Sequence, residues 1–174
     1  MLKRTVLTLA TLALLPLPSL AAMQCATGLT HVTVNGSVTT LNVSETKQVG
    51  QICVSLIRTA NGREVFADCG ALVGKVLSRD EQNMSSVLTH TALFNLRNVF
   101  VTHNDQAQIT GVQAVDEAGA PCAFDVVETI SEIEKGAGIF RDGQIQVTAT
   151  GSISFCPGKN LNTFALQGEA CIRK

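Results

Sequence analysis

The sequence contains neither tryptophan nor tyrosine. Sugar-binding platforms and the aromatic girdles of membrane barrels depend on these rings, which join an apolar body to a polar tip. Their absence argues against a carbohydrate-binding module and against an outer-membrane barrel. Clusters of basic residues are also missing along the whole chain, and nucleic-acid binding depends on them. We therefore expect no nucleic-acid partner.

Recognisable catalytic and metal-binding motifs are absent as well. The chain has no Gly-x-Ser-x-Gly elbow, no His-Glu-x-x-His pair, no Walker loop and no Cys-x-x-Cys pair. The histidines His31, His90 and His103 are too widely spaced to chelate a metal from one strand face. These absences predict no metal and no cofactor. They leave catalysis open but favour a protein that is not an enzyme.

The first 22 residues have the three parts of a secretory signal peptide. The chain starts Met-Leu-Lys-Arg, an uncharged run follows over residues 5–17, and cleavage sites lie after Ala21 and Ala22. The uncharged run is shorter than the ~20 apolar residues that a membrane-spanning helix needs. We therefore expect a secreted or periplasmic protein without a membrane span.

The remaining residues, 23–174, have the size of one domain and carry little net charge. The leader removes two of the 13 basic residues, so 11 stand against 14 acidic ones and the net charge becomes −3. That charge is too small to attract a polyanion or an anionic membrane. A lipoprotein anchored at Cys25 is the alternative, but Gln24 is not the small residue that acylation needs before the cysteine.

Apolar and polar residues alternate with a period of two through most of the mature chain, which predicts strands. The clearest case runs from Gln144 to Phe155. Further strands are expected at 27–34, 37–44, 48–59, 63–69, 71–78, 86–96, 98–103, 107–116, 122–133 and 161–172. Turn residues separate them, including Asn35-Gly36 and Asn61-Gly62, because Asn-Gly is the preferred two-residue hairpin turn.

Many short strands with almost no helical periodicity predict an all-β domain. We predict a single antiparallel β-barrel over residues 23–174, with a β-sandwich as the alternative. Gly111, Gly151 and Gly168 favour the barrel, because glycine within a strand suits the bends of a closing sheet.

Six cysteines lie in the mature chain. An even number in an oxidising compartment predicts three disulfides, although fifteen pairings are open on sequence alone. Cys53 and Cys69 are each eight positions from Asn61, so a hairpin that turns there sets them opposite one another. We expect these two to pair.

The other two pairs follow from the order of the strands. Cys25 and Cys171 open the first strand and close the last, so they meet if those strands seal a barrel. Cys122 and Cys156 remain, across a hairpin centred near Ile139. Their strand registers conflict, so a bulge or a cysteine just outside its strand is needed.

The segment Glu-Lys-Gly136-Ala-Gly138-Ile-Phe140-Arg-Asp-Gly143 has a Gly-x-Gly-x-Phe…Gly pattern. It resembles a segment of the allene oxide cyclase and dirigent proteins, which are eight-stranded antiparallel barrels. The resemblance covers residues 120–172, and the two residues between Phe140 and Gly143 are fewer than those families usually have. It implies a barrel fold. It implies no activity, because none of those families' catalytic residues can be placed on this chain.

Two ionisable residues, Glu128 and His90, interrupt apolar strand faces. If those faces point inward, both lie inside the barrel, where a carboxylate needs a partner. The expected partner of Glu128 is His90, Arg97 or Arg58, and Glu128 and His90 are the candidate catalytic pair. The candidate ligand-binding residues are Arg97, Phe94 and Phe124. A second candidate cluster is Thr102-His103-Asn104-Asp105, in which Asp105 is positioned to orient His103.

The sequence is compatible with three functions. The first is a binding protein for a small apolar ligand, or an interaction scaffold, without catalysis. The second is an isomerase or cyclase that uses Glu128 and His90 for proton transfer. The third is a structural surface protein that assembles through an edge strand.

Overall fold

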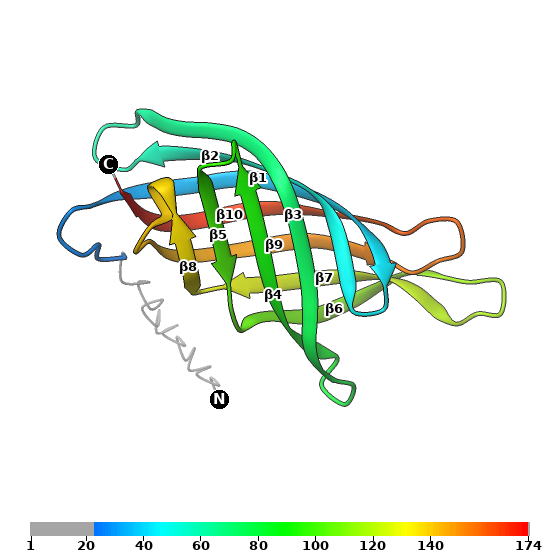
Figure 1. The fold of residues 1–174 in the computed structure, drawn as a ribbon. Coiled ribbons are helices and arrows are strands. Elements are labelled where there is room, and N and C mark those ends of the chain that lie inside the picture. Colours follow the sequence, from blue (N-terminus) through cyan, green and yellow to red (C-terminus); the bar gives the residue numbers. More distant parts are fainter. Residues whose placement is uncertain (1–22, 174) are drawn as a thin grey trace, which may run out of the picture.

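The computed structural model describes residues 23–173 (Figure 1), so the expected signal peptide over residues 1–22 lies outside the described residues. The described part of the chain forms one antiparallel sheet and a single 3₁₀ turn. Its elements are β1 (Leu29–Ser44), β2 (Lys47–Arg58), β3 (Glu64–Asp80), β4 (Ser85–Phe94), β5 (Asn98–Thr102), β6 (Asp105–Val115), β7 (Pro121–Ile130), β8 (Ile133–Ala137), η1 (Gly138–Phe140), β9 (Gln144–Ser154) and β10 (Leu161–Arg173). No helix within these residues is long and apolar enough to cross a membrane.

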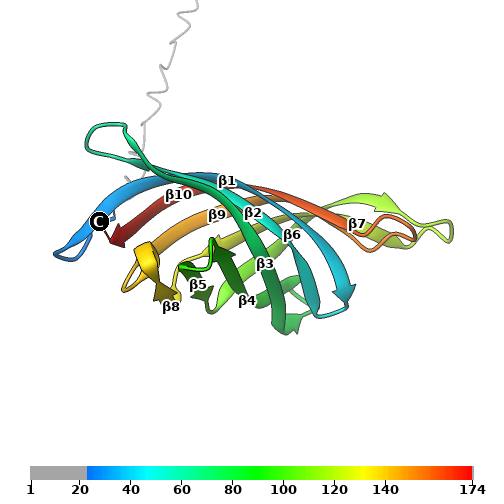
Figure 2. The same cartoon turned by 45° about the horizontal axis from the view of Figure 1, so that its top comes forward.

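Eight of the strands close into a ring. They follow the order β3-β2-β1-β10-β9-β7-β6-β4, and a further pairing of β3 with β4 completes the circle. The start of β4 pairs with β6, while its end pairs with β5, which in turn pairs with β8. The sheet is strongly curved (Figure 2), and one ring replaces the two stacked sheets of a sandwich. The prediction of an all-β antiparallel fold is confirmed.

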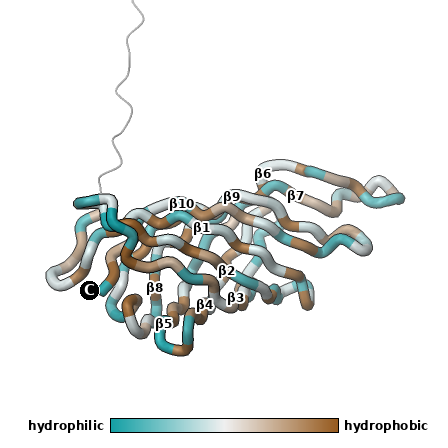
Figure 3. Tube along the Cα trace, turned by 90° about the horizontal axis from the view of Figure 1, so that it is seen from above, coloured by the Kyte–Doolittle hydropathy of each residue, from teal (hydrophilic) through white to brown (hydrophobic). Residues whose placement is uncertain are grey.

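Most strands alternate buried and exposed residues, as their sequences predict. In β9 the buried residues Ile145, Val147 and Ala149 alternate with exposed ones. Figure 3 shows apolar and polar residues interleaved along the strands rather than gathered on separate strands. The inner face of the ring is therefore the core, and the outer face contacts solvent.

Three predicted strand boundaries are wrong. Asn35-Gly36 is not a turn, because β1 runs through it and pairs these residues with Ser55 and Val54 of β2. Gly36 instead allows close contact between strands, since a Cβ there would lie 2.4 Å from the Cys53 carbonyl oxygen. The expected strands 63–69 and 71–78 form one strand, β3, and the expected strand 122–133 is divided between β7 and β8.

Glycines on β9 and β10 let adjacent strands approach closely. A Cβ on Gly151 would lie 1.9 Å from the Thr163 carbonyl oxygen, and one on Gly168 would lie 2.2 Å from that of Gln146. These contacts support the predicted role of glycine in the tight curvature of the sheet. Gly111 differs, because it lies at an irregularity in the pairing of β6 with β7, where a Cβ would meet the Asp125 side chain.

Four phenylalanines fill the end of the ring where β1 begins, which we name the closed end. Phe66, Phe94, Phe100 and Phe140 come from β3, β4, β5 and η1. Their rings make tilted and edge-to-face contacts, with the centroids of Phe100 and Phe140 5.0 Å apart. Such pairs add to the stabilisation that comes from burial. Phe140, the last residue of η1, thus places its side chain among the phenylalanines that fill the closed end.

The six cysteines form three disulfides: Cys25–Cys171, Cys53–Cys69 and Cys122–Cys156. These are the three pairs expected from the sequence. Cys156 lies just beyond the last residue of β9, which resolves the register conflict noted above. Three disulfides in one domain indicate an oxidising compartment.

Candidate functional site

The end of the ring where β1 finishes and β2 starts is open, and we name it the open end. It contains a pocket of about 590 Å³. Polar and charged residues surround its rim, from the ends of β1 and β3 and the turns that follow them. Its deeper walls are apolar and include Leu88, Ile109, Phe124, Val126 and Ile153. Phe124, a candidate ligand-binding residue from the sequence, therefore lines this pocket.

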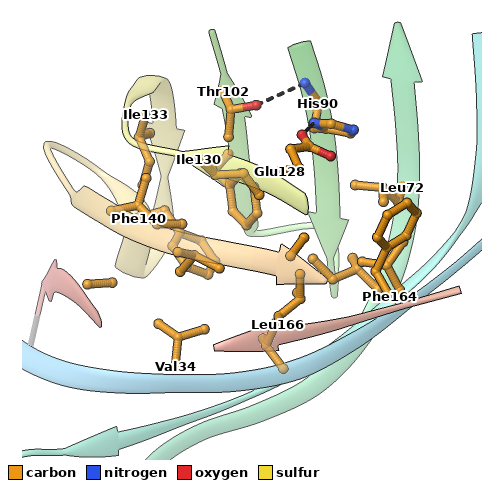
Figure 4. Close-up of a pocket in the computed structure, with 18 of the residues that line it drawn as sticks. Val34, Leu72, His90, Thr102, Glu128, Ile130, Ile133, Phe140, Phe164 and Leu166 are labelled. Carbon is orange, nitrogen blue, oxygen red and sulfur yellow. Dashed lines mark hydrogen bonds and ion pairs between the residues drawn. The ribbon is translucent and has the colours of Figure 1, made fainter. Parts of the chain in front are cut away.

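A smaller cavity of about 60 Å³ lies further inside the ring (Figure 4). Its walls are mostly apolar, with Gln48, His90, Thr102 and Glu128 as exceptions. Glu128, Gln48 and Phe164 line both this cavity and the open pocket. Glu128 therefore lies where the two spaces adjoin, at the floor of the open pocket.

Four buried polar residues meet at this floor: His90 on β4, Thr102 on β5, Asp105 on β6 and Glu128 on β7. Strand pairing brings them together, because β6 lies between β4 and β7 at this level of the ring. Gly74 on β3 leaves room for the imidazole, since a Cβ there would lie 2.9 Å from His90 Nε2. We name these four residues the floor cluster.

Asp105 is the centre of the hydrogen bonds in the floor cluster. His90 Nδ1 lies 2.8 Å from Asp105 Oδ2, and a carboxylate only accepts, so this nitrogen carries the proton. The Thr102 hydroxyl donates to the same carboxylate oxygen. The backbone N–H of His90 donates to Thr102 Oγ1 at 2.9 Å. The carboxylate thus keeps a proton on Nδ1 and fixes the orientation of the imidazole.

Glu128 is close to His90 but receives no hydrogen bond from it. Glu128 Oε1 lies 3.4 Å from His90 Nδ1, while the proton on that nitrogen is directed to Asp105. Both Glu128 Oε1 and Asp105 Oδ1 are buried without a hydrogen-bond partner among the described residues. Two carboxyl oxygens in one apolar interior therefore lack a donor, and each unpaired buried polar atom destabilises the fold.

Burial dominates the electrostatics of the floor cluster. Loss of solvent raises the pKa of Glu128, the charge of His90 lowers it in part, and the charge of Asp105 raises it further. Burial disfavours the imidazolium of His90, but the carboxyl groups of Glu128 and Asp105 outweigh this and raise the pKa of His90. Burial therefore raises the pKa of Glu128, the carboxyl groups beside His90 raise the pKa of the imidazole, and the charge on each member of the pair favours the charge on the other.

The structure brings Glu128 and His90 together, as expected, but not the other candidates. Arg97 is exposed in the turn between β4 and β5, and Arg58 is at the end of β2 opposite the open pocket, so neither is the partner of Glu128. Phe94 is fully buried among the phenylalanines of the closed end. Arg97 and Phe94 therefore line neither of these two spaces, and their candidate role in ligand contact stays a prediction.

The contact of Asp105 was not anticipated. The sequence predicted that it orients His103, but in the structure it holds His90, one strand away. The sequence pattern did contain this information, because Asp105, Ala107 and Ile109 alternate with a period of two and lie on the inward face of β6. The predicted strand began at residue 107, which left Asp105 outside the alternation.

A second buried polar group was also missed. Asn162 is fully buried on β10 and donates to Thr40 Oγ1 at 3.2 Å and to Asn42 Oδ1 at 2.8 Å. Thr40 donates to Gln48 Oε1 at 2.6 Å. Both Asn162 and Thr40 stand in otherwise apolar registers, which is the same signal that identified Glu128 and His90. These bonds hold Gln48 in position on the wall of the open pocket.

No protein-family model, curated protein or solved structure matches this chain. The resemblance to allene oxide cyclase and dirigent proteins therefore stays a prediction.

Proposed function

We propose that this protein binds a small, largely apolar molecule in the open end of its ring and does not catalyse a reaction on it. The observation that supports this most directly is the unfilled interior. A structural scaffold has no need of such a space, whereas ligand pockets have volumes of about 300–1,000 Å³ and mostly apolar walls. The pocket here, at about 590 Å³, is within that range.

The ligand would enter with its polar end towards the floor of the pocket. Gln48 and Glu128 are the polar residues that line both the open pocket and the inner cavity. A few polar groups at the base of an apolar pocket fix the orientation of a ligand, and the apolar walls supply most of the affinity. We infer a ligand with one hydrogen-bonding group at the end of a hydrocarbon body.

Binding is preferred over isomerase chemistry because of the hydrogen bonds in the floor cluster. Proton transfer between His90 and Glu128 needs a hydrogen bond or a single water that joins them. The Nδ1 proton of His90 is instead held by Asp105, and Glu128 Oε1 has no donor. This arrangement orients His90 firmly but gives Glu128 no partner for proton exchange.

We also propose that the protein binds its ligand outside the cytosol, in the periplasm or the extracellular space. The three disulfides support an oxidising compartment, and the signal-peptide pattern of residues 1–22 supports export.

Titration with N-phenyl-1-naphthylamine, a neutral dye that fluoresces in apolar surroundings, tests the binding proposal. Wild-type protein is expected to raise the dye's fluorescence with a saturable curve. Ala107→Trp should weaken the dye's affinity by about tenfold or more. Ala107 lines the pocket and pairs directly with Glu128 across the strands, so an indole there occupies the space above the floor.

Thr110→Trp is the matched control, because Thr110 is an exposed residue on the same strand and does not line the pocket. It should leave the dye's affinity unchanged. The chain has no other tryptophan, so energy transfer from each indole to the dye also reports how close the dye is bound. Absence of saturable binding, or equal affinity for both variants, would refute the proposed site.

A further inference from the structure

We propose that His90, Asp105 and Glu128 form a binding site for one divalent transition-metal cation of the Zn²⁺ class. The site lies at the floor of the open pocket, but the inference does not rest on the apolar ligand. It departs from the sequence-based expectation of no metal. That expectation considered ligands on a single strand face, whereas the fold collects these three residues from β4, β6 and β7.

The unpaired oxygens are the first argument. Asp105 is completely buried and Glu128 is 5% exposed, and each has a carboxyl oxygen without a hydrogen-bond partner. A ligand in the open pocket can reach Glu128, which lines it, but Asp105 lines neither the pocket nor the inner cavity. A cation lodged between the side chains would satisfy both oxygens at once and would offset their charge.

The distances are the second argument. His90, Asp105 and Glu128 each offer one ligand atom, and the three atoms lie within 4.8 Å of one another. Two ligands on a tetrahedral ion with bonds near 2.1 Å are about 3.4 Å apart. The distance between His90 Nδ1 and Glu128 Oε1 is 3.4 Å. His90 Nδ1 is hydrogen-bonded to Asp105 Oδ2, so the cation would replace the Nδ1 proton and bind Asp105 through its unpaired oxygen, Oδ1.

The donor set identifies the class of cation. One imidazole nitrogen with two carboxylate oxygens suits Zn²⁺ and its first-row neighbours. Mg²⁺ and Ca²⁺ take oxygen ligands almost exclusively, so the imidazole disfavours them. Three protein ligands leave a position for water or for a polar group of a bound molecule. His90 and Glu128 both line the inner cavity, which provides space for that additional ligand.

Calorimetric titration of the EDTA-treated, dialysed protein with ZnCl₂ tests the inference. One Zn²⁺ per chain is expected to bind with a dissociation constant in the micromolar range or below, and excess Zn²⁺ should raise the melting temperature. Co²⁺ should give visible absorption bands typical of a four-coordinate site. Glu128→Gln should weaken Zn²⁺ binding by about 100-fold or more, because it removes one charged ligand.

His31→Asn is the matched control. His31 also contacts a carboxylate, with Nε2 3.2 Å from Glu169 Oε2, but this pair is partly exposed and distant in sequence from the floor cluster. It should leave Zn²⁺ affinity unchanged. Absence of Zn²⁺ binding to the wild type, by heat and by melting temperature alike, overturns the inference. Binding that survives Glu128→Gln and is lost in His31→Asn also overturns it. The dye titration is done with EDTA present, so it tests ligand binding without a metal. Failure of the proposed ligand pocket and failure of the proposed metal site can therefore be told apart.

Discussion

Removal of the Cys25–Cys171 disulfide is expected to lower the free energy of unfolding by about 5 kcal/mol, more than removal of either other disulfide. Its cysteines are 146 residues apart in the sequence, against 16 for Cys53–Cys69 and 34 for Cys122–Cys156. A cross-link restricts the unfolded chain more as the loop that it closes becomes longer. Guanidinium unfolding of the double alanine variant under non-reducing conditions measures the loss.

The matched control for that variant replaces Cys53 and Cys69 with alanine, and a loss of about 3 kcal/mol is expected. Alanine is used because Cys171 is fully buried, where the hydroxyl of a serine would need a hydrogen-bond partner. The ladder between β1 and β10 remains intact without the bond, so the variant should still fold. Equal losses for the two variants, or the reverse order, would show that loop length does not control the stabilisation here.

The sequence predicted the fold class because period-two alternation is a local property. In β9 the polarity of each residue alone determines the face on which it lies. The disulfide pairs were also accessible, because a hairpin at Asn61 or a seam between the first and last strands fixes which cysteines face one another. These are consequences of antiparallel pairing and need no knowledge of the interior.

Boundaries were less accessible, because Asn-Gly has two structural uses. At Asn61-Gly62 the glycine has φ +67° and forms the turn of the hairpin between β2 and β3. At Asn35-Gly36 the same dipeptide continues a strand, and the missing Cβ accommodates the neighbouring backbone. Only the pairing of β1 with strands far along the chain separates the two uses. Local propensity therefore could not place this boundary.

The candidate site was predicted in part for a similar reason. Glu128 and His90 were visible as polar residues in apolar registers, and the fold brings them within 3.4 Å. Asp105 could be recognised only once β6 was known to start there and to lie beside β4. The partner of His90 thus depends on which strands are neighbours in the ring, and strand order is not encoded in a local pattern.

Asp105→Asn is expected to destabilise the metal-free protein by about 3 kcal/mol or more. The fully buried carboxylate of Asp105 accepts hydrogen bonds from His90 and from Thr102. The asparagine amide has no charge, so the imidazolium of His90 loses the negative charge that balances it. The amide also places an N–H group beside the N–H of His90 and the hydroxyl of Thr102, which are both donors. Urea unfolding with EDTA present measures the loss.

Glu128→Gln is the isosteric comparison, and its effect on the same measurement should be below about 1 kcal/mol in either direction. Glu128 Oε1 accepts no hydrogen bond, and the raised pKa of this carboxyl group already disfavours its charge. The substitution removes the charge that helps to raise the pKa of His90, but it also removes the cost of burying that charge, so the net change in the stability of the metal-free fold should be small. A carboxyl group that adds nothing to stability, at the floor of an apolar pocket, is explained by what it binds. If Glu128→Gln proves as destabilising as Asp105→Asn, Glu128 is a structural partner of His90 and this explanation fails.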